Sequence, residues 1–180
     1  MYFSSFPVIP YGSTDGTVKN VTNLLRRVAI RTKVKSNAAL YDTYNVKNGE
    51  TPEIIADKLY EDPELHWVVL MVNNVTDRYH DWPMSEQQFN SYLIEKYSDP
   101  AGIHHHEISQ ESGDTTQKIE VYDPDLISSD TDAYTSATAI TNREFEESEQ
   151  DKKRKIRLLD PEFIDQFVDE FKNLMKESII

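Results

Sequence analysis

The chain has 180 residues, a net charge of −13 and no cysteine, which excludes disulfides, thiolate zinc sites and cysteine nucleophiles. Its apolar content of 38% is enough for the core of one ordinary domain, and the absence of thiols fits assembly in a reducing cytoplasm. The N-terminus lacks a basic region and an apolar core, and no apolar run approaches roughly 18 residues. We therefore expect neither a signal peptide nor a membrane span.

The charge is distributed unevenly along the chain. Residues 1–40 carry six basic and one acidic side chain, whereas residues 99–150 carry two basic and thirteen acidic ones. Separate basic and acidic segments favour complementary contacts with other proteins over nucleic-acid binding, which usually needs a basic face. A solvated acidic surface that only aids solubility is the simpler alternative.

Residues 1–38 are predicted to form an extended arm followed by a basic strand. Pro7 and Pro10 fix φ and remove backbone donors, so the first residues are expected to be extended, with aromatic anchors. From residue 18 the apolar pattern first fits a helical turn and then alternates over Val28–Lys35, which predicts a strand there.

Residues 39–100 hold the most consistent local signals. A strand is predicted over Leu40–Val46, ending at an Asn-Gly turn. A first helix begins at Thr51 with Pro52 in its first position, and a second helix begins at Asp62-Pro63 and ends before Asn73-Asn74. After an irregular aromatic segment, Ser85 and Gln88 form a capping-box pattern that predicts a third helix.

Residues 101–180 are predicted to contain a hairpin, an exposed loop and a closing helix. The hairpin spans residues 103–123, and the Ser-, Thr- and Asp-rich residues 124–142 are expected to be exposed or ordered only on binding. A charged helix over residues 144–155 and a short strand over Lys155–Leu159 follow. The last helix begins at Asp160-Pro161 and is strongly amphipathic, so it packs on the core or on a partner.

Candidate catalytic and metal-binding residues do not converge in this sequence. Of the three consecutive histidines, His104 and His106 share one face of a strand and His105 points away, so at most two ligands meet. Zinc needs three or four ligands, and strand histidines are the favoured interpretation. Aromatic residues near Asp62 and Glu64 resemble a glycosidase pocket, but helix N-termini already explain these carboxylates. We expect no metal, no cofactor and no enzymatic activity.

Tyr41–Asn74 resembles a LysM module, a small β-α-α-β fold. The resemblance lies in YNV, in KNGETPEIIADKLY and in Asn73-Asn74 after the second helix. Many LysM modules bind N-acetylglucosamine polymers. By position, the resemblance implies that Gly49, Glu50, Thr51 and Asn74 are the candidate glycan-binding residues.

A longer stretch of the chain resembles the baseplate wedge protein 53 family of T-even-like contractile-tailed phages. The resemblance rests on LYEDPELHWVVLMVNNVTDRYHDWPMSEQQF, on RRVAIR, on the histidine-containing stretch and on KRKIRLLDPEFI. It implies a structural subunit of the tail baseplate in the virion, present in multiple copies in a symmetric ring and assembled in the bacterial cytoplasm. The implied partners are other wedge proteins, including the gene-six product and the gene-twenty-five product, with no nucleic acid and no membrane.

The sequence therefore predicts an α+β chain with a LysM-like core, an N-terminal arm or strand, a β-hairpin and a C-terminal amphipathic helix. The favoured function is a wedge subunit that joins neighbouring wedge proteins during assembly and transmits sheath contraction. The alternative is a peptidoglycan-binding LysM protein of a cell-wall or lytic system. The candidate protein contacts are Arg27, Arg31, Trp67, Tyr79 and Trp82, although both tryptophans have a simpler interpretation as core residues beneath the second helix.

Overall fold

The computed structural model describes residues 2–14, 16–109, 118–122 and 137–177, which form helices and strands in two compact units. The first unit comprises Met1–Trp82 and Arg154–Ile180, and the second comprises Pro83–Lys153. The prediction of a mixed α+β chain is confirmed. The division into units differs from the predicted segment boundaries after residues 38 and 100, because the C-terminal part of the chain returns to the first unit.

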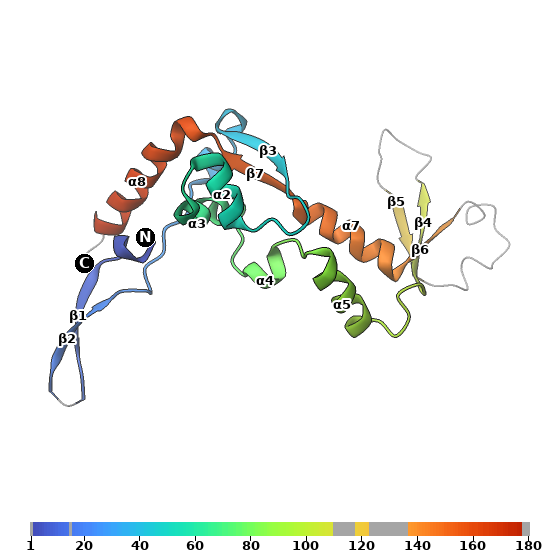
Figure 1. Cartoon of the computed structure of the whole chain (residues 1–180), viewed down its shortest axis with the longest axis horizontal. Coiled ribbons are helices and arrows are strands. Elements are labelled where there is room, and N and C mark those ends of the chain that lie inside the picture. Colours follow the sequence, from blue (N-terminus) through green and yellow to red (C-terminus); the bar gives the residue numbers. More distant parts are fainter. Residues whose placement is uncertain (1, 15, 110–117, 123–136, 178–180) are drawn as a thin grey trace. The chain divides into compact units, whose positions relative to one another are not determined.

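The first unit contains both chain ends and most of the apolar core. Figure 1 labels its main helices and strands. Its elements are, in chain order, η1 (Tyr2–Ser5), β1 (Val8–Gly12), β2 (Val18–Thr22), α1 (Thr32–Lys35), η2 (Ala38–Leu40), β3 (Tyr41–Asn45), α2 (Pro52–Tyr60), η3 (Pro63–Leu65), α3 (His66–Val72), α4 (Arg78–Asp81), β7 (Lys155–Leu159), η4 (Pro161–Phe163) and α8 (Ile164–Glu177), where η denotes a 3₁₀ helix.

The helices α2 and α3 begin and end where local sequence signals predict. The Thr51 hydroxyl accepts a hydrogen bond from the Ile54 N–H at 3.4 Å, and Pro52 occupies the first position of α2. The Asp62 carboxylate accepts one from the Glu64 N–H at 2.8 Å and so starts η3, which leads into α3. After α3, Asn74 adopts φ 55°, the left-handed conformation that asparagine tolerates. Both predicted helices are confirmed.

Strand β3 pairs with β7, which lies far from it in the sequence (Figure 1). The two strands are antiparallel, with Tyr41 opposite Leu159 and Asn45 opposite Lys155. The predicted strand over Lys155–Leu159 is thereby confirmed. The order β-α-α-β is present, and its closing strand comes after the whole second unit.

The outer edge of β7 is covered by side chains. Hydrogen bonds from Val46 to Arg154 and from Asp160 to Leu40 flank the β3–β7 pair, so the backbone groups of Arg157 and Leu159 point away from β3. The Asn73 side-chain amide donates to the Arg157 carbonyl and accepts from the Arg157 N–H, both at 2.8 Å. The Tyr60 hydroxyl donates to the Leu159 carbonyl at 2.9 Å. Asn73 thus bonds β7 as a neighbouring strand would.

The core of the first unit joins α2, α3, β7 and α8. Ile55 and Ala56 of α2, Val69 of α3 and Ile156 and Leu158 of β7 are all buried in one cluster. A second cluster contains Phe6 near the N-terminus and Phe171 and Met175 of α8. The predicted amphipathic helix therefore packs on the core of its own chain.

The strand predicted over Val28–Lys35 is wrong. Residues 23–31 form no helix or strand, and Thr32–Lys35 forms the single-turn helix α1. The alternation is still visible in the exposure of the side chains, because Val28 and Ile30 are partly buried while Arg27 and Arg31 are exposed. Alternation predicts which side chains face the core, but a strand also needs a backbone partner, and none of the described strands pairs with this segment.

The predicted extended arm is instead an antiparallel hairpin of β1 and β2. Val8 lies opposite Thr22, and Gly12 lies opposite Val18. Extended backbone over β1 agrees with the prediction, whereas β2 replaces the helical turn expected from residue 18. Hydrogen bonding across the hairpin, which the prolines of the arm do not prevent, accounts for the difference.

The second unit contains α5 (Glu86–Lys96), a three-stranded sheet and α7 (Asn142–Arg154), of which only Arg154 belongs to the first unit. The sheet has the order β5 (Lys118–Val121), β4 (Ile103–Ser109), β6 (Thr138–Thr141), and both pairs are antiparallel. The capping box of Ser85 and Gln88, the hairpin of β4 and β5 and the charged helix are confirmed. Strand β6 lies within the segment that was predicted to be a loop. The predicted turn at residues 110–116 lies outside the described residues, as do residue 117 and residues 123–136.

Among the residues that the structure describes, none of the helices has the length and apolar character that crossing a bilayer requires.

Leu158→Ala should lower the free energy of unfolding of the first unit by about 2–5 kcal/mol, because it leaves a cavity in the cluster that joins β7 to α2 and α3. The measurement is urea unfolding followed by tryptophan fluorescence, since Trp67 and Trp82, the two tryptophans, both lie in this unit. Thr43→Ala on the exposed part of β3 is the control and should change stability by less than about 0.5 kcal/mol. Equal effects of the two substitutions would contradict the packing described for β7.

Candidate protein-interaction site

Trp67 lies at the centre of an aromatic cluster drawn from three distant parts of the chain. Its ring centroid is 4.5 Å from that of Phe171 on α8 and 5.3 Å from that of Tyr2 in η1. Tyr2 and Phe171 stack on each other at 5.5 Å. Trp67 packs against the buried core but is itself only partly buried, so part of the residue stays accessible.

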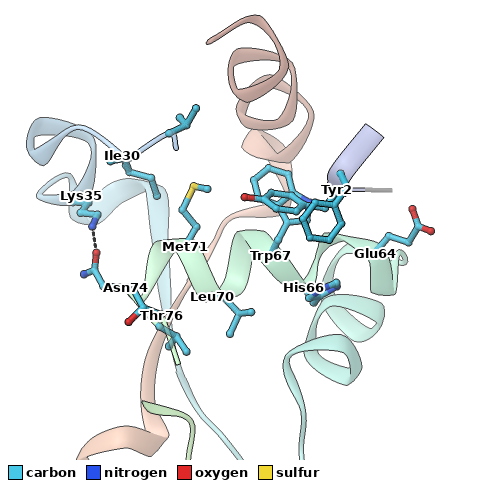
Figure 2. Close-up of a pocket in the computed structure, with 14 residues that line it drawn as sticks. Tyr2, Ile30, Lys35, Glu64, His66, Trp67, Leu70, Met71, Asn74 and Thr76 are labelled. Carbon is cyan, nitrogen blue, oxygen red and sulfur yellow. Dashed lines mark hydrogen bonds between the residues drawn. The ribbon is translucent and has the colours of Figure 1, made fainter. Parts of the chain in front are cut away.

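A pocket of about 600 Å³ lies beside this cluster. Figure 2 shows Tyr2, Trp67 and Met71 along it, with the two rings side by side. Lys35 at the pocket margin donates a hydrogen bond to the Asn74 side chain. The lining is mainly apolar, with charged groups at its margin. Such a composition suits a protein contact with an apolar centre.

A second pocket of about 340 Å³ shares Val28, Ala29, Ile30 and Met71 with the first. We call it the arginine groove, because three arginines lie along it. Its remaining lining residues are Arg26, Arg27, Arg31, Val34, Phe167, Glu170, Phe171 and Leu174.

The segment that supplies these arginines is held to the unit by polar contacts. The Arg26 guanidinium donates to the Leu174 carbonyl of α8 at 3.2 Å, and the Arg157 guanidinium donates to the Lys35 carbonyl at 2.9 Å. Arg27 and Arg31 are exposed. An irregular but anchored segment therefore places two exposed cations beside Phe167 and Phe171.

Tyr79 and Trp82 follow one another closely in the sequence but lie in different environments. Tyr79 is 84% exposed on the one-turn helix α4. The Arg78 guanidinium anchors α4 by donating two hydrogen bonds to the Glu53 carboxylate, at 2.7 and 3.1 Å. Trp82 is only 7% exposed, and its indole N–H donates to the Glu50 carbonyl at 2.9 Å. Trp82 thus occupies the core, as the simpler interpretation of the sequence has it.

The structure brings three of the five candidate contacts to one region. Arg27 and Arg31 line the arginine groove, and Trp67 lines the adjoining pocket. Neither Tyr79 nor Trp82 lines the arginine groove or its neighbour. The sequence did not indicate that α8 would form the opposite wall, since helix amphipathicity does not say where the apolar face docks.

The residues expected to bind glycan in a LysM protein are used by the fold itself. The Glu50 carboxylate is buried and accepts hydrogen bonds from the Tyr44 hydroxyl at 2.9 Å, the Lys47 N–H at 2.9 Å and the Lys58 ammonium at 2.6 Å. Thr51 caps α2, and Gly49 adopts φ 77° in the turn before it. The Asn74 side chain accepts from Lys35. Burial raises the pKa of Glu50, but the bonds from Lys58, Lys47 and Tyr44 outweigh it and hold this pKa below its ordinary value.

The second unit holds a similar buried carboxylate. Glu146 of α7 is 4% exposed and accepts hydrogen bonds from the Lys96 ammonium at 2.6 Å and the Tyr97 hydroxyl at 2.8 Å. Burial raises the pKa of Glu146, and these bonds bring it below its ordinary value. Nothing in the charged sequence around Glu146 distinguishes it from its exposed neighbours, because its partners come from the last residue and the C-cap of α5.

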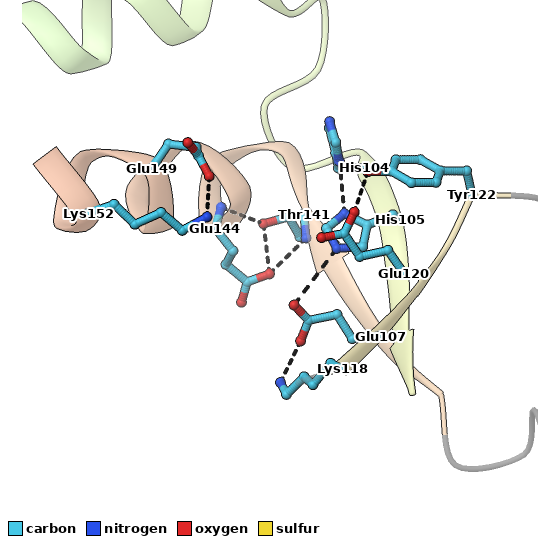
Figure 3. Close-up of polar contacts among 10 residues, drawn as sticks. All are labelled: His104, His105, Glu107, Lys118, Glu120, Tyr122, Thr141, Glu144, Glu149 and Lys152. Carbon is cyan, nitrogen blue, oxygen red and sulfur yellow. Dashed lines mark hydrogen bonds and ion pairs between the residues drawn. The ribbon is translucent and has the colours of Figure 1, made fainter. Parts of the chain in front are cut away.

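The three histidines lie on β4 in the second unit, and Figure 3 shows His104 and His105. His105 is buried, and its Nδ1 lies 2.8 Å from Nδ1 of His104. The His104 ring stacks on Phe145 with the ring centroids 3.9 Å apart, and burial lowers its pKa. Within the described ranges, no group of three or more histidine, aspartate or glutamate side chains is arranged to hold a metal ion.

The model of the base plate wedge protein 53 family matches residues 1–171 of the chain. The chain is also 37% identical over 60 residues to baseplate wedge protein gp53 of Enterobacteria phage T4. That alignment covers 33% of this chain and 31% of the T4 protein.

Glu50→Gln should lower the free energy of unfolding of the first unit by about 1–3 kcal/mol at pH 7, because it weakens the bonds from Lys58 and Tyr44 in a buried place. Urea unfolding followed by tryptophan fluorescence measures this change in the free energy of unfolding. Glu170→Gln on exposed α8 is the matched control and should change stability by less than about 0.5 kcal/mol.

The same variant should change the pH dependence of stability. Because the pKa of Glu50 is lower in the folded chain, its contribution is present above the ordinary glutamate pKa of about 4.3 and is lost as pH falls through the folded value. Unfolding measured from pH 7 to pH 3 should therefore show a smaller acid loss for Glu50→Gln than for the unsubstituted chain. If the free energy of unfolding fell equally with pH in Glu50→Gln and in the unsubstituted chain, Glu50 would contribute nothing to the acid sensitivity.

Proposed function

The chain belongs to the base plate wedge protein 53 family, and we propose that it is a structural, non-catalytic subunit of a phage tail baseplate. In this proposal it joins neighbouring wedge proteins during assembly and transmits sheath contraction through these joints. The partners are other wedge proteins, of which the gene-six-like and gene-twenty-five-like subunits are the candidates. Its location is the baseplate of the virion, after assembly in the bacterial cytoplasm.

The arginine groove is the observation that carries this proposal. Arginine and aromatic residues are enriched where protein interfaces gain most of their affinity. Arg27 and Arg31 are exposed beside an apolar groove that α8 closes on one side. A partner segment with apolar anchors and acidic side chains would bury the groove and pair with both guanidinium groups.

We further propose that β3, α2, α3 and β7 form a LysM-like module that serves as a scaffold. The β-α-α-β order supports this proposal. The engagement of Glu50, Thr51 and Asn74 within the chain supports a scaffold role over glycan binding, since a sugar would have to displace these internal bonds.

The double variant Arg27→Glu/Arg31→Glu should weaken binding to baseplate wedges at least about tenfold, because both cations would repel an acidic partner. Wedges prepared without this chain are mixed with the labelled full-length chain, and co-sedimentation measures the binding. The control Lys47→Glu/Lys155→Glu changes the net charge equally at two exposed positions of the first unit outside the groove, and it should bind like the unsubstituted chain.

Two outcomes would contradict the proposed function. The first is that the unsubstituted chain does not sediment with the wedges. The second is that the chain sediments instead with purified peptidoglycan, which is the behaviour of a cell-wall-binding LysM protein.

A further inference from the structure

The hairpin of β1 and β2 is an exposed two-stranded sheet. All five residues of each strand are exposed. Five of these residues are large apolar ones, Val8, Ile9, Tyr11, Val18 and Val21, with exposed fractions from 36% to 71%. A two-stranded sheet is marginally stable in water unless a third strand or a packed face supports it. Among the described residues no third strand pairs with either edge, so the hairpin has backbone groups and apolar surface that a partner could bury.

The backbone of the hairpin shows which groups point outward. The Ser13 N–H donates to the Thr17 carbonyl, and the Asn23 N–H donates to the Pro7 carbonyl, both at 2.8 Å. In an antiparallel pair of strands, hydrogen-bonded residue pairs alternate with pairs that are not hydrogen-bonded. Both bonds join odd-numbered residues, so the backbone N–H and C=O groups of the odd-numbered residues between them face the other strand. The backbone groups of the even-numbered residues point to the outer edges.

The two outer edges are not equivalent. On β1 the outward position in the middle is Pro10, which has no N–H to donate. A strand added there would lose a central hydrogen bond, so proline protects that edge. On β2 the outward residues are Val18, Asn20 and Thr22, all of which keep their N–H groups. Among the described residues, the only strand that pairs with β2 is β1.

We propose that the outer edge of β2 accepts an extended, acidic strand from another baseplate protein and so becomes the central strand of a three-stranded sheet. This inference rests on the proposed function, since it assumes that the chain joins other subunits. Strand addition of this kind obtains its affinity from main-chain hydrogen bonds and its specificity from the alternating side chains.

Charge decides what kind of strand fits. Lys19, opposite Tyr11, is the one charged side chain on β1 and β2. Pairing of β2 with β2 of a second copy would bring two Lys19 ammonium groups onto neighbouring strands, and like charges there are destabilising. An acidic strand would instead pair with Lys19.

The test uses the full-length chain and wedges prepared without it, with co-sedimentation as the measurement. Asn20→Pro removes the central outward N–H of β2 without removing a hydrogen bond inside the hairpin, and it should weaken binding at least about tenfold. Thr22→Pro, a second outward position on β2, should act in the same direction. Asn20→Ala keeps the N–H, and Val8→Pro adds a proline to the edge that Pro10 already protects. Both controls should bind like the unsubstituted chain.

The outcomes separate this inference from the proposed function. If the unsubstituted chain binds the wedges and both Asn20→Pro and Thr22→Pro bind equally well, strand addition is wrong while the structural role stands. A Val8→Pro variant as weak as Asn20→Pro would show that damage to the hairpin causes the loss, which also overturns strand addition. If the unsubstituted chain fails to bind, both proposals fall. Dimers of the free chain that Asn20→Pro abolishes would identify a second copy as the occupant and overturn the acidic partner.

Discussion

The pairing of β3 with β7 is the constraint on which the first unit depends. Without β7, the strand after Leu40 would have no partner, and the apolar faces of α2 and α3 would lose Ile156 and Leu158. The second unit lies between these two strands in the sequence, so bringing them together lowers the entropy of the chain. The apolar burial and the hydrogen bonds of the β3–β7 pair must offset this loss. Asn73 and Tyr60 hold the other edge of β7, which makes this strand part of the module formed by β3, α2 and α3.

The closed module explains how the proposed interaction surfaces are positioned. Strand β7 leads directly through η4 into α8, and α8 supplies one side of the arginine groove. None of the described strands pairs with the segment carrying Arg27 and Arg31, and Arg26 and Arg157 hold this segment through backbone carbonyls. The exposed cations are therefore positioned by contacts from the C-terminal part of the chain. The pairing of β7 with β3 and the packing of α8 both hold that part in this unit.

The sequence predicted correctly those features that depend on neighbours within four residues. These features are the helix caps at Thr51, Asp62 and Ser85 and the left-handed conformation of Asn74. Strand pairing between distant segments could not be predicted from the sequence. The alternation from Val28 shows which side chains face the core, but it does not show whether another strand is available to pair with this segment. Strands β2 and β6 were missed because their pairing partners could not be identified from the sequence either. In the candidate site, arginine and tryptophan were recognisable by type, but only the tertiary fold separates exposed Arg27 from buried Trp82.

Hydrogen exchange of the free chain and of the chain in assembled baseplates tests the scaffold role most directly. We expect slower exchange in the baseplate over β2 and over residues 26–31, because a partner would cover the outer edge of β2 and the arginine groove. Exchange in the turn at Gly49 and Glu50 should stay unchanged, since its polar groups are already bonded within the chain. Protection confined to that turn and to Asn74, with none over β2 or residues 26–31, would contradict the scaffold role and favour a ligand-binding module.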